Sequence, residues 1–254
     1  MNSYRNTCRR YSVLTLVVLI LVTSACGNPA SDMVPVPEPP DKILFVGNSL
    51  TYWNGGLEHH IVQLAGSAHP PLVIQADSVV RSGAPLKTMW EYTEAREMIG
   101  EGRYDVVVLQ DALPWTDVDT FHEYTRLFVE EIRDTGAEPV LFMTWSRVGL
   151  TVEEIAQAYG DIATELGVDV APVGFAWQRA MEERSDLDMY DTDNTHPSIR
   201  GSYLAVSVIY AAVLGESPVG LAYLPSEDPG VTEDEAAFLQ RIAWETVQEY
   251  QAQH

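Results

Sequence analysis

The stretch Lys42-Ile43-Leu44-Phe45-Val46-Gly47-Asn48-Ser49-Leu50-Thr51 decides the fold. It begins as an uninterrupted apolar run, which predicts a strand that is buried on both faces, as in a parallel sheet. Gly47 and Asn48 then supply a turn, so Ser49 is expected just past the carboxyl end of the first strand. Ligands bind at that edge in open α/β sheets, which makes Ser49 a candidate nucleophile.

Strands and helices are predicted to alternate along residues 41–254, which we expect to form one domain. Further strands are expected at about 72–76, 105–110, 139–144 and 168–173, and helices at about 56–66, 86–99, 119–134, 151–166, 174–184, 198–214 and 232–250. Thr151 with Glu154, and Thr232 with Glu235, form capping boxes that open two of the helices. This alternation predicts right-handed βαβ units: a three-layer α/β/α fold around a five-stranded parallel sheet.

Residues 1–25 are typical of a signal peptide. Three arginines precede an apolar stretch at 13–22, which is too short to cross a bilayer comfortably, and small residues precede Cys26. Small residues directly before a cysteine resemble a bacterial lipobox, which implies an extracytoplasmic lipoprotein, periplasmic or on the cell surface, anchored in a membrane through lipid on Cys26. An ordinary signal peptide or an uncleaved anchor are the alternatives. Residues 26–40 comprise this cysteine and a proline-rich tether.

The chain is strongly acidic, with 37 acidic and 15 basic residues and a formal net charge of −22. Residues 1–25 hold three of the basic residues and no acidic one, so the mature chain would carry 12 basic and 37 acidic residues, a net charge of −25. Such a surface argues against nucleic acid and anionic membrane surfaces as partners. It also predicts a salt-rich habitat, because salt relieves self-repulsion.

The cysteines are Cys8 and Cys26. Cleavage of the signal peptide would remove Cys8, and lipid would occupy Cys26. The mature domain would then have neither a disulfide nor a cysteine-based metal site. The acidic stretch 182–193 lacks the glycine and the alternating ligands of an EF-hand. We therefore expect no metal and no other cofactor.

A serine hydroxyl becomes a good nucleophile when a base takes its proton, and the base is commonly a histidine oriented by a carboxylate. The candidate segment is Asp191-Thr-Asp193-Asn-Thr-His196-Pro197, on a loop that leads into a helix. Asp193 and His196 are three residues apart, so one segment could supply both base and orienting acid. Asp191 is a rival orienter. The loop follows the fifth strand and can fold back over the first.

Gly47-Asn48-Ser49-Leu50 after a first strand, with Asp193-x-x-His196-Pro197 near the end, resembles the SGNH (GDSL-like) hydrolase superfamily. The resemblance covers about 42–215 and implies a flavodoxin-like sheet. It also implies a catalytic triad in which Ser49 is the nucleophile, His196 the general base and Asp193 the residue that orients it. The Gly-x-Ser-x-Gly elbow of α/β-hydrolases is absent, which argues against that class.

The same resemblance implies an oxyanion hole with three donors. The first is the amide of the nucleophile Ser49, and the second is a glycine amide after the second strand, where this chain has Gly83. The third is an asparagine side chain after the third strand. This chain lacks that asparagine, and we expect Gln110 to supply the donor instead. Gly83 could also be a plain turn glycine, and Gln110 could bond the adjacent loop.

These residues together predict an esterase that removes short acyl groups, such as acetyl, from carbohydrate. Trp115 and Trp145 follow the third and fourth strands and would either wall a substrate cleft or pack into the core. The expected partners are therefore a small-molecule or glycan ester and, through the lipid, a membrane. The alternatives are a non-catalytic glycan-binding surface lipoprotein, or a lipase, phospholipase or thioesterase.

Overall fold

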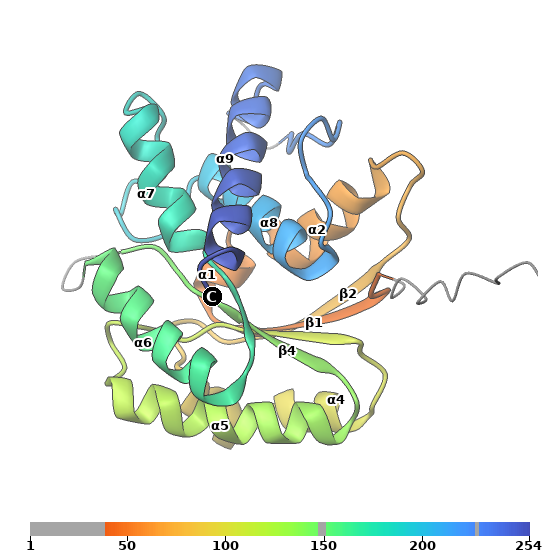
Figure 1. Cartoon of the computed structure of the whole chain (residues 1–254), viewed down its shortest axis with the longest axis vertical. Helices are drawn as coiled ribbons and strands as arrows, with labels where there is room; N and C mark the ends of the chain where they lie inside the picture. The colour runs from red at the N-terminus through yellow and green to blue at the C-terminus, as the bar shows by residue number, and fades with distance from the viewer. Residues whose placement is uncertain (1–38, 147–150, 227–228) are drawn as a thin grey trace, which may run out of the picture. The chain divides into compact units, whose positions relative to one another are not determined.

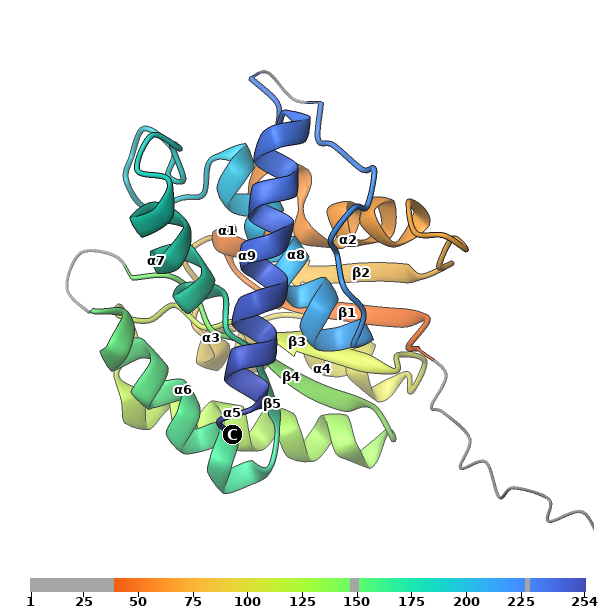
Figure 2. The ribbon, with the colours of Figure 1, turned by 45° about the horizontal axis from the view of Figure 1, so that its top comes forward.

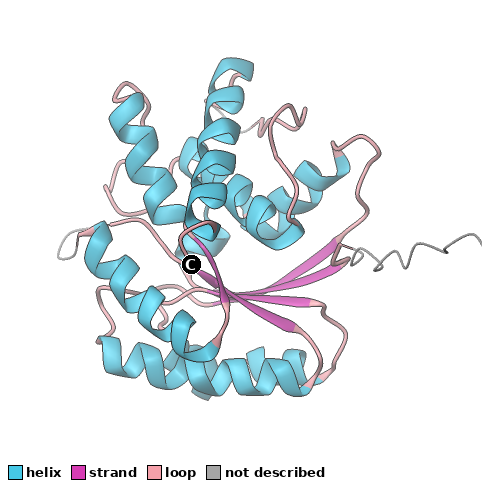
Figure 3. Cartoon of the chain, viewed as in Figure 1, coloured by secondary structure: helices cyan, strands magenta, loops and turns pink. Residues whose placement is uncertain are grey.

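The computed structural model of the protein describes residues 39–146, 151–226 and 229–254. Five strands form one sheet and all of them are parallel, as Figure 3 shows in magenta. Their order across the sheet is β2-β1-β3-β4-β5. The strands are β1 Lys42–Gly47, β2 Gln75–Val80, β3 Val106–Leu109, β4 Glu138–Phe142 and β5 Asp169–Ala171. The predicted five-stranded parallel sheet is confirmed, and its strand order is the flavodoxin-like one.

Helices cover both faces of the sheet and complete the predicted three layers (Figures 1 and 2). One face packs against α2 Leu57–Gly66, α7 Val173–Glu183, α8 Ile199–Leu214 and α9 Glu233–Gln251. The other face packs against α3 Leu86–Tyr92, α4 Ala95–Gly100, α5 Val118–Asp134 and α6 Val152–Leu166. Both predicted capping boxes are present, at the starts of α6 and α9.

The sequence of β1 explains why the sheet is buried on both sides. Ile43 and Phe45 belong to the core cluster that includes α8, whereas Leu44 and Val46 belong to the cluster that includes α5. Successive side chains of a strand point to opposite faces, so an apolar run without alternation fills both clusters. β1 also pairs with β2 on one side and β3 on the other. It therefore lies inside the sheet, as its sequence predicts.

The second strand differs from the sequence prediction of 72–76. β2 spans Gln75–Val80, pairs with β1 alone and lies at the edge of the sheet. Val79 is its one fully buried residue. An edge strand tolerates polar residues such as Asp77 and Ser78, so β2 lacks the apolar run by which the other strands are recognised.

The predicted helix over 86–99 is two helices, α3 and α4. Thr93 has an extended backbone, with φ −133° and ψ 172°, and ends α3. Its hydroxyl donates to the Met89 carbonyl (2.5 Å) and accepts from the Ala95 backbone N–H (3.3 Å). A threonine hydroxyl that bonds nearby backbone competes with the helix, and this accounts for the break.

The predicted signal peptide, Cys26 and the tether as far as residue 38 lie outside the described residues. Within the described ranges, no helix combines the length and the apolar character that crossing a bilayer requires.

Candidate active site

Ser49 lies in the turn that leaves β1 at the carboxyl edge of the sheet. Asn48 caps the short helix α1, Ser49–Tyr52, because its side-chain oxygen accepts from the Leu50 backbone N–H (3.1 Å). The Asn48 side-chain amide also donates to the Ala84 carbonyl (3.1 Å), which ties this turn to the turn after β2. Ser49 is the first residue of α1, where a backbone N–H has no acceptor within the helix. Its side chain is nearly buried, with 6% of the residue exposed.

The loop between α7 and α8 brings a histidine and an aspartate to this serine. His196 Nε2 lies 2.7 Å from Ser49 Oγ, and His196 Nδ1 lies 2.5 Å from Asp193 Oδ2. The other carboxylate oxygen of Asp193 accepts from the backbone N–H groups of Thr195 and His196, each at 2.9 Å. A continuous chain of hydrogen bonds thus joins the three residues that the sequence predicts as a triad, although 147 positions separate Ser49 from His196.

The Asp193 carboxylate is held in its ionised form. Its hydrogen bond with His196, supported by the two backbone N–H groups and opposed by partial burial, lowers the pKa of Asp193 from 3.8 to about 2. An anionic Asp193 accepts a hydrogen from Nδ1 of His196, which leaves the Nε2 lone pair facing Ser49. This is the tautomer that a general base for Ser49 needs.

Trp53 covers one face of the His196 ring, a contact that we do not predict from the sequence. The two rings are stacked, with centroids 3.9 Å apart and 12° between their planes. Trp53 Nε1 donates to Asp191 Oδ2 (3.1 Å), so the rival orienter bonds Trp53, whereas Asp193 bonds the histidine. Trp53 comes one helical turn after Ser49. An aromatic residue at that spacing from the nucleophile is the signal in the sequence that points to it.

Gly83 lies in the turn after β2, next to the turn that carries Ser49. Its φ of +64° is in the left-handed region that favours glycine. Apart from its chain neighbours, no described heavy atom lies within 4 Å of the place that a β-carbon on Gly83 would occupy. The turn therefore leaves open space above it. The roles of the Ser49 and Gly83 amides in an oxyanion hole stay predictions.

Gln110 bonds the turn after β1 and the adjacent loop. Its side chain is 1% exposed and lies under the Ser49 turn, where Oε1 accepts from the Asn48 backbone N–H (2.9 Å) and from Thr51 Oγ1 (3.1 Å). Its Nε2 donates to the Asp111 carbonyl. Gln110 therefore supports the turn through Oε1 and bonds the adjacent loop through one hydrogen of Nε2, and its role as the third oxyanion donor stays a prediction.

The two predicted substrate-binding tryptophans lie in different surroundings. Trp115 is 64% exposed in the loop after β3, so it is accessible to a ligand. Trp145 is fully buried and stacks on Trp177 of α7, with ring centroids 4.1 Å apart. The expectation of a substrate-binding role for Trp145 is therefore wrong, because no face of its ring is accessible. Its Nε1 instead donates to the Thr195 carbonyl (3.2 Å), next to His196 in the loop between α7 and α8.

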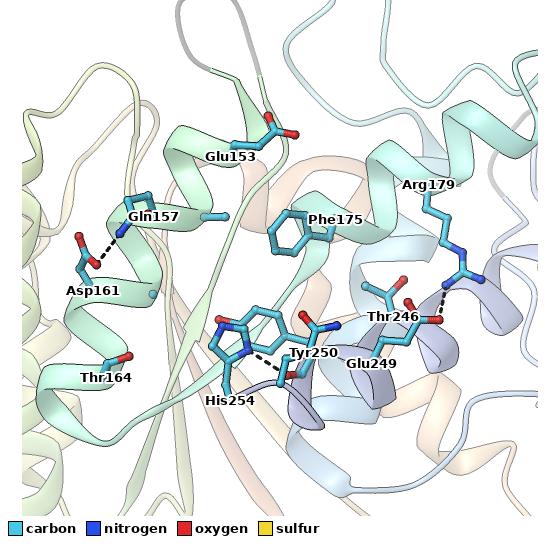
Figure 4. A pocket seen from close by; sticks show the side chains of 13 residues that line it. Glu153, Gln157, Asp161, Thr164, Phe175, Arg179, Thr246, Glu249, Tyr250 and His254 are labelled. Carbon is cyan, nitrogen blue, oxygen red and sulfur yellow. Dashed lines mark hydrogen bonds and ion pairs between the residues drawn. The ribbon is translucent and has the colours of Figure 1, made fainter.

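A hollow of about 620 Å³ lies between α6, α7 and α9 (Figure 4). Residues such as Gln157, Phe175 and Tyr250 line it, and none of Ser49, Asp193 and His196 does. We place the candidate active site at the hydrogen-bonded Ser49, His196 and Asp193, none of which lines this hollow. Among the described residues no three histidine, aspartate, glutamate or cysteine side chains are grouped as metal ligands would be.

No protein-family model and no curated protein sequence matches the chain, but solved structures do. A protein from Slackia heliotrinireducens assigned to the SGNH hydrolases is 24% identical, with a TM-score of 0.57 over 67% of this chain and 97% of that chain. A DUF4886 family protein from Bacteroides uniformis is 15% identical, with a TM-score of 0.61 over 82% of this chain and 94% of that one. The acetylxylan esterase Axe2 from Geobacillus stearothermophilus is 18% identical, with a TM-score of 0.56 over 72% and 97%. The chain therefore has the fold of the SGNH hydrolases.

Proposed function

We propose that the protein is a serine esterase of the SGNH type, with Ser49, His196 and Asp193 as its catalytic triad. The observation that supports this most is the unbroken chain of hydrogen bonds from Ser49 Oγ through both nitrogens of His196 to Asp193. An isolated serine after a strand could be a turn residue. A serine within 2.7 Å of an imidazole that is itself oriented by a carboxylate has the arrangement that activates a hydroxyl.

In the proposed reaction, Ser49 Oγ attacks the ester carbonyl carbon while His196 Nε2 takes the hydroxyl proton. The negative charge that develops on the carbonyl oxygen is stabilised by the backbone N–H groups of Ser49 and Gly83. The bond to the alcohol then breaks, and the imidazolium returns its proton to the leaving oxygen. Water attacks the acyl-enzyme with His196 again as the base, which releases the acid and restores the serine hydroxyl.

The preferred substrate is a short acyl group, such as acetyl, on a carbohydrate. An exposed aromatic ring suits the apolar face of a sugar, and Trp115 offers one in the loop after β3, the strand next to β1. One structural neighbour, Axe2, is an acetylxylan esterase, and its similarity in fold agrees with this preference. Two alternatives remain. The first is an enzyme that acts on long-chain esters or thioesters, and the second is a protein that binds glycan without catalysis.

Labelling with a fluorophosphonate probe, together with turnover of p-nitrophenyl acetate, tests the proposal. Ser49→Ala should abolish labelling and lower turnover by at least about 10⁴-fold. Ser67→Ala, at the end of α2 and bonded to the Leu64 carbonyl, is the matched control and should leave both unchanged. A wild-type protein that neither reacts with the probe nor turns over the ester would refute the esterase. In a series of p-nitrophenyl esters, a maximum at long chains would contradict the short-acyl preference.

We also propose that the protein is exported and held at a membrane, in the periplasm or at the cell surface, through lipid on Cys26. The proposal rests on the lipobox-like residues before this cysteine. Cys26→Ser should move the protein from the membrane fraction to the soluble extracytoplasmic fraction and abolish labelling with radioactive palmitate. Cys8→Ser, within the predicted signal peptide, is the control. A Cys26→Ser protein that stays in the membrane fraction would contradict lipid anchoring.

A further inference from the structure

Arg81 lies at the end of the strand next to β1, beside the start of the turn that carries Ser49. It directly follows β2, and its backbone N–H donates to the Gly47 carbonyl (3.1 Å). The parallel register pairs the last residue of β2 with Gly47, so Arg81 is level with the residue that precedes Ser49. Neighbouring strands are about 4.8 Å apart, and from that distance an arginine side chain is long enough to reach a substrate bound at Ser49. Arg81 also begins the turn that carries Gly83.

Arg81 differs from every other arginine that the structure describes. Seven of the others form ion pairs with carboxylates, and Arg133 donates to two backbone carbonyls. Arg179 alone pairs with three glutamates, and Figure 4 shows its bond to Glu249. The guanidinium of Arg81 has no hydrogen bond or ion pair with any of the described residues, and the residue is exposed. The eight partnered residues are Arg96, Arg103, Arg126, Arg133, Arg179, Arg184, Arg200 and Arg241.

An unpartnered guanidinium is notable in this protein because acidic residues outnumber basic ones by 37 to 15. Such a surface repels an anionic substrate at long range. A positive charge carried by the strand end next to the Ser49 turn would offset that repulsion close to the proposed site. The planar guanidinium also presents paired N–H donors whose geometry matches a carboxylate, which allows two parallel hydrogen bonds.

We propose that Arg81 binds a carboxylate on the alcohol part of the substrate, so that the natural substrate is an acylated acidic sugar, such as a uronate, or a similar carboxylated alcohol. The proposal rests on the esterase function proposed above and adds the substrate class. Arg81 is then a specificity-determining residue that acts on substrate binding and not on the bond-breaking step. With Arg81 on the β2 side of Ser49 and the exposed Trp115 after β3 on the other, one sugar ring could contact both.

Matched pairs of acetyl esters test the inference. The wild type is assayed with 4-acetoxybenzoate against p-nitrophenyl acetate, and with acetylated methyl glucuronoside against acetylated methyl glucoside. Arg81→Gln should lower kcat/KM for the carboxylated ester by about tenfold, mainly through KM, and leave the neutral ester within about twofold. Arg81→Lys should restore part of the difference, because it keeps the charge without the paired donors. Added NaCl should shrink the difference in kcat/KM between the wild type and Arg81→Gln for the carboxylated esters, because salt screens the attraction between the guanidinium and the carboxylate.

Arg96→Gln is the control, because Arg96 is an exposed arginine on α4 that is paired with Glu131. Arg96→Gln should leave kcat/KM for both esters unchanged. The inference is overturned if Arg81→Gln lowers kcat/KM equally for the two esters, or for neither of them. If the wild type still reacts with the fluorophosphonate probe in that case, the proposed esterase function stands. If a phosphorylated or sulfated sugar ester shows the dependence on Arg81 and the uronate ester does not, the carboxylate assignment is overturned. A wild type that the probe does not label overturns both proposals.

Discussion

His196 is fixed by contacts on three sides. Asp193 bonds Nδ1, Ser49 lies against Nε2, and Trp53 stacks on the ring face. Trp53 is in turn bonded to Asp191, which lies in the same loop as the histidine. The segment that follows Ser49 thus contacts the loop that carries His196. We therefore expect the distance between Ser49 Oγ and His196 Nε2 to depend on Trp53.

We expect Trp53→Ala to lower kcat for p-nitrophenyl acetate by about tenfold or more with little change in KM, because a small displacement of the base is costly and the stacked ring is lost. Trp53→Phe keeps a ring against the imidazole and should retain most of kcat. Steady-state kinetics and the rate of fluorophosphonate labelling measure both effects. Thermal midpoints of the two variants serve as the control for folding. An alanine variant with wild-type kcat would contradict a positioning role for Trp53.

Asp193 gives a pH dependence with a definite sign. Because its pKa falls from 3.8 to about 2 in the folded protein, its ionised form stabilises the fold above about pH 4. That contribution is lost as the pH falls through about 2. Urea unfolding of the wild type and Asp193→Asn between pH 2 and pH 6 measures it. The free energy of unfolding of the wild type should exceed that of the variant most near pH 6. The difference should shrink towards pH 2. A difference that grows on acidification would contradict this assignment.

At the scale of the element, the turn between β1 and α1 depends on a residue from the neighbouring strand end. Gln110, directly after β3, accepts hydrogen bonds from the Asn48 backbone and the Thr51 hydroxyl. A β-carbon on Gly47 would lie 2.4 Å from Thr51 Oγ1 and 2.8 Å from Gln110 Oε1. The turn is therefore packed too closely for any side chain at position 47.

Gln110→Leu should lower the free energy of unfolding by about 2 kcal/mol or more, because it leaves a buried N–H and a buried hydroxyl without an acceptor. Urea unfolding measures the loss. Gln157→Leu, on the exposed face of α6 and bonded to Asp161, is the matched control and should change stability little. If Gln110→Leu were fully stable and lost activity alone, Gln110 would act as an oxyanion donor and the proposed support of the turn would be contradicted.

The elements that could be predicted from the sequence are those whose residues carry the signal locally. The apolar run of β1 matches the strand Lys42–Gly47, and the two capping boxes open α6 and α9 where they are expected. That Ser49, His196 and Asp193 come together could be predicted for the same reason, since each lies in a short motif. The edge strand β2 has no such run.

Side-chain roles that depend on packing between distant elements could not be predicted. Trp145 follows β4 at the ligand-binding edge, yet Trp177 of α7 covers its ring and buries it. Gln110 follows β3 where a donor is expected, yet the turn after β1 uses its amide. Whether such a residue faces a ligand or a neighbouring element is decided by chain segments that its own sequence position does not reveal.

At the scale of the whole molecule, 37 acidic residues face 15 basic ones, so 22 negative charges remain even if every basic residue forms an ion pair. Nearly every arginine that the structure describes is already bonded to acidic side chains or carbonyls, so the remaining carboxylates repel one another across the surface. Most of the ion pairs are exposed, and exposed pairs contribute little each. Repulsion among the excess carboxylates should therefore dominate the response of stability to salt.

We expect the midpoint of thermal unfolding to rise between about 0.05 M and 1 M NaCl, over which the screening length falls to about 3 Å. Scanning calorimetry at several chloride concentrations measures the rise, and KCl should act like NaCl if screening is the cause. Replacing the exposed Glu123, Glu130 and Glu153 by glutamine should raise the midpoint at low salt and reduce its dependence on salt. An unchanged or falling midpoint would mean that the exposed ion pairs matter more than the excess charge, and the predicted salt-rich habitat would lose its physical basis.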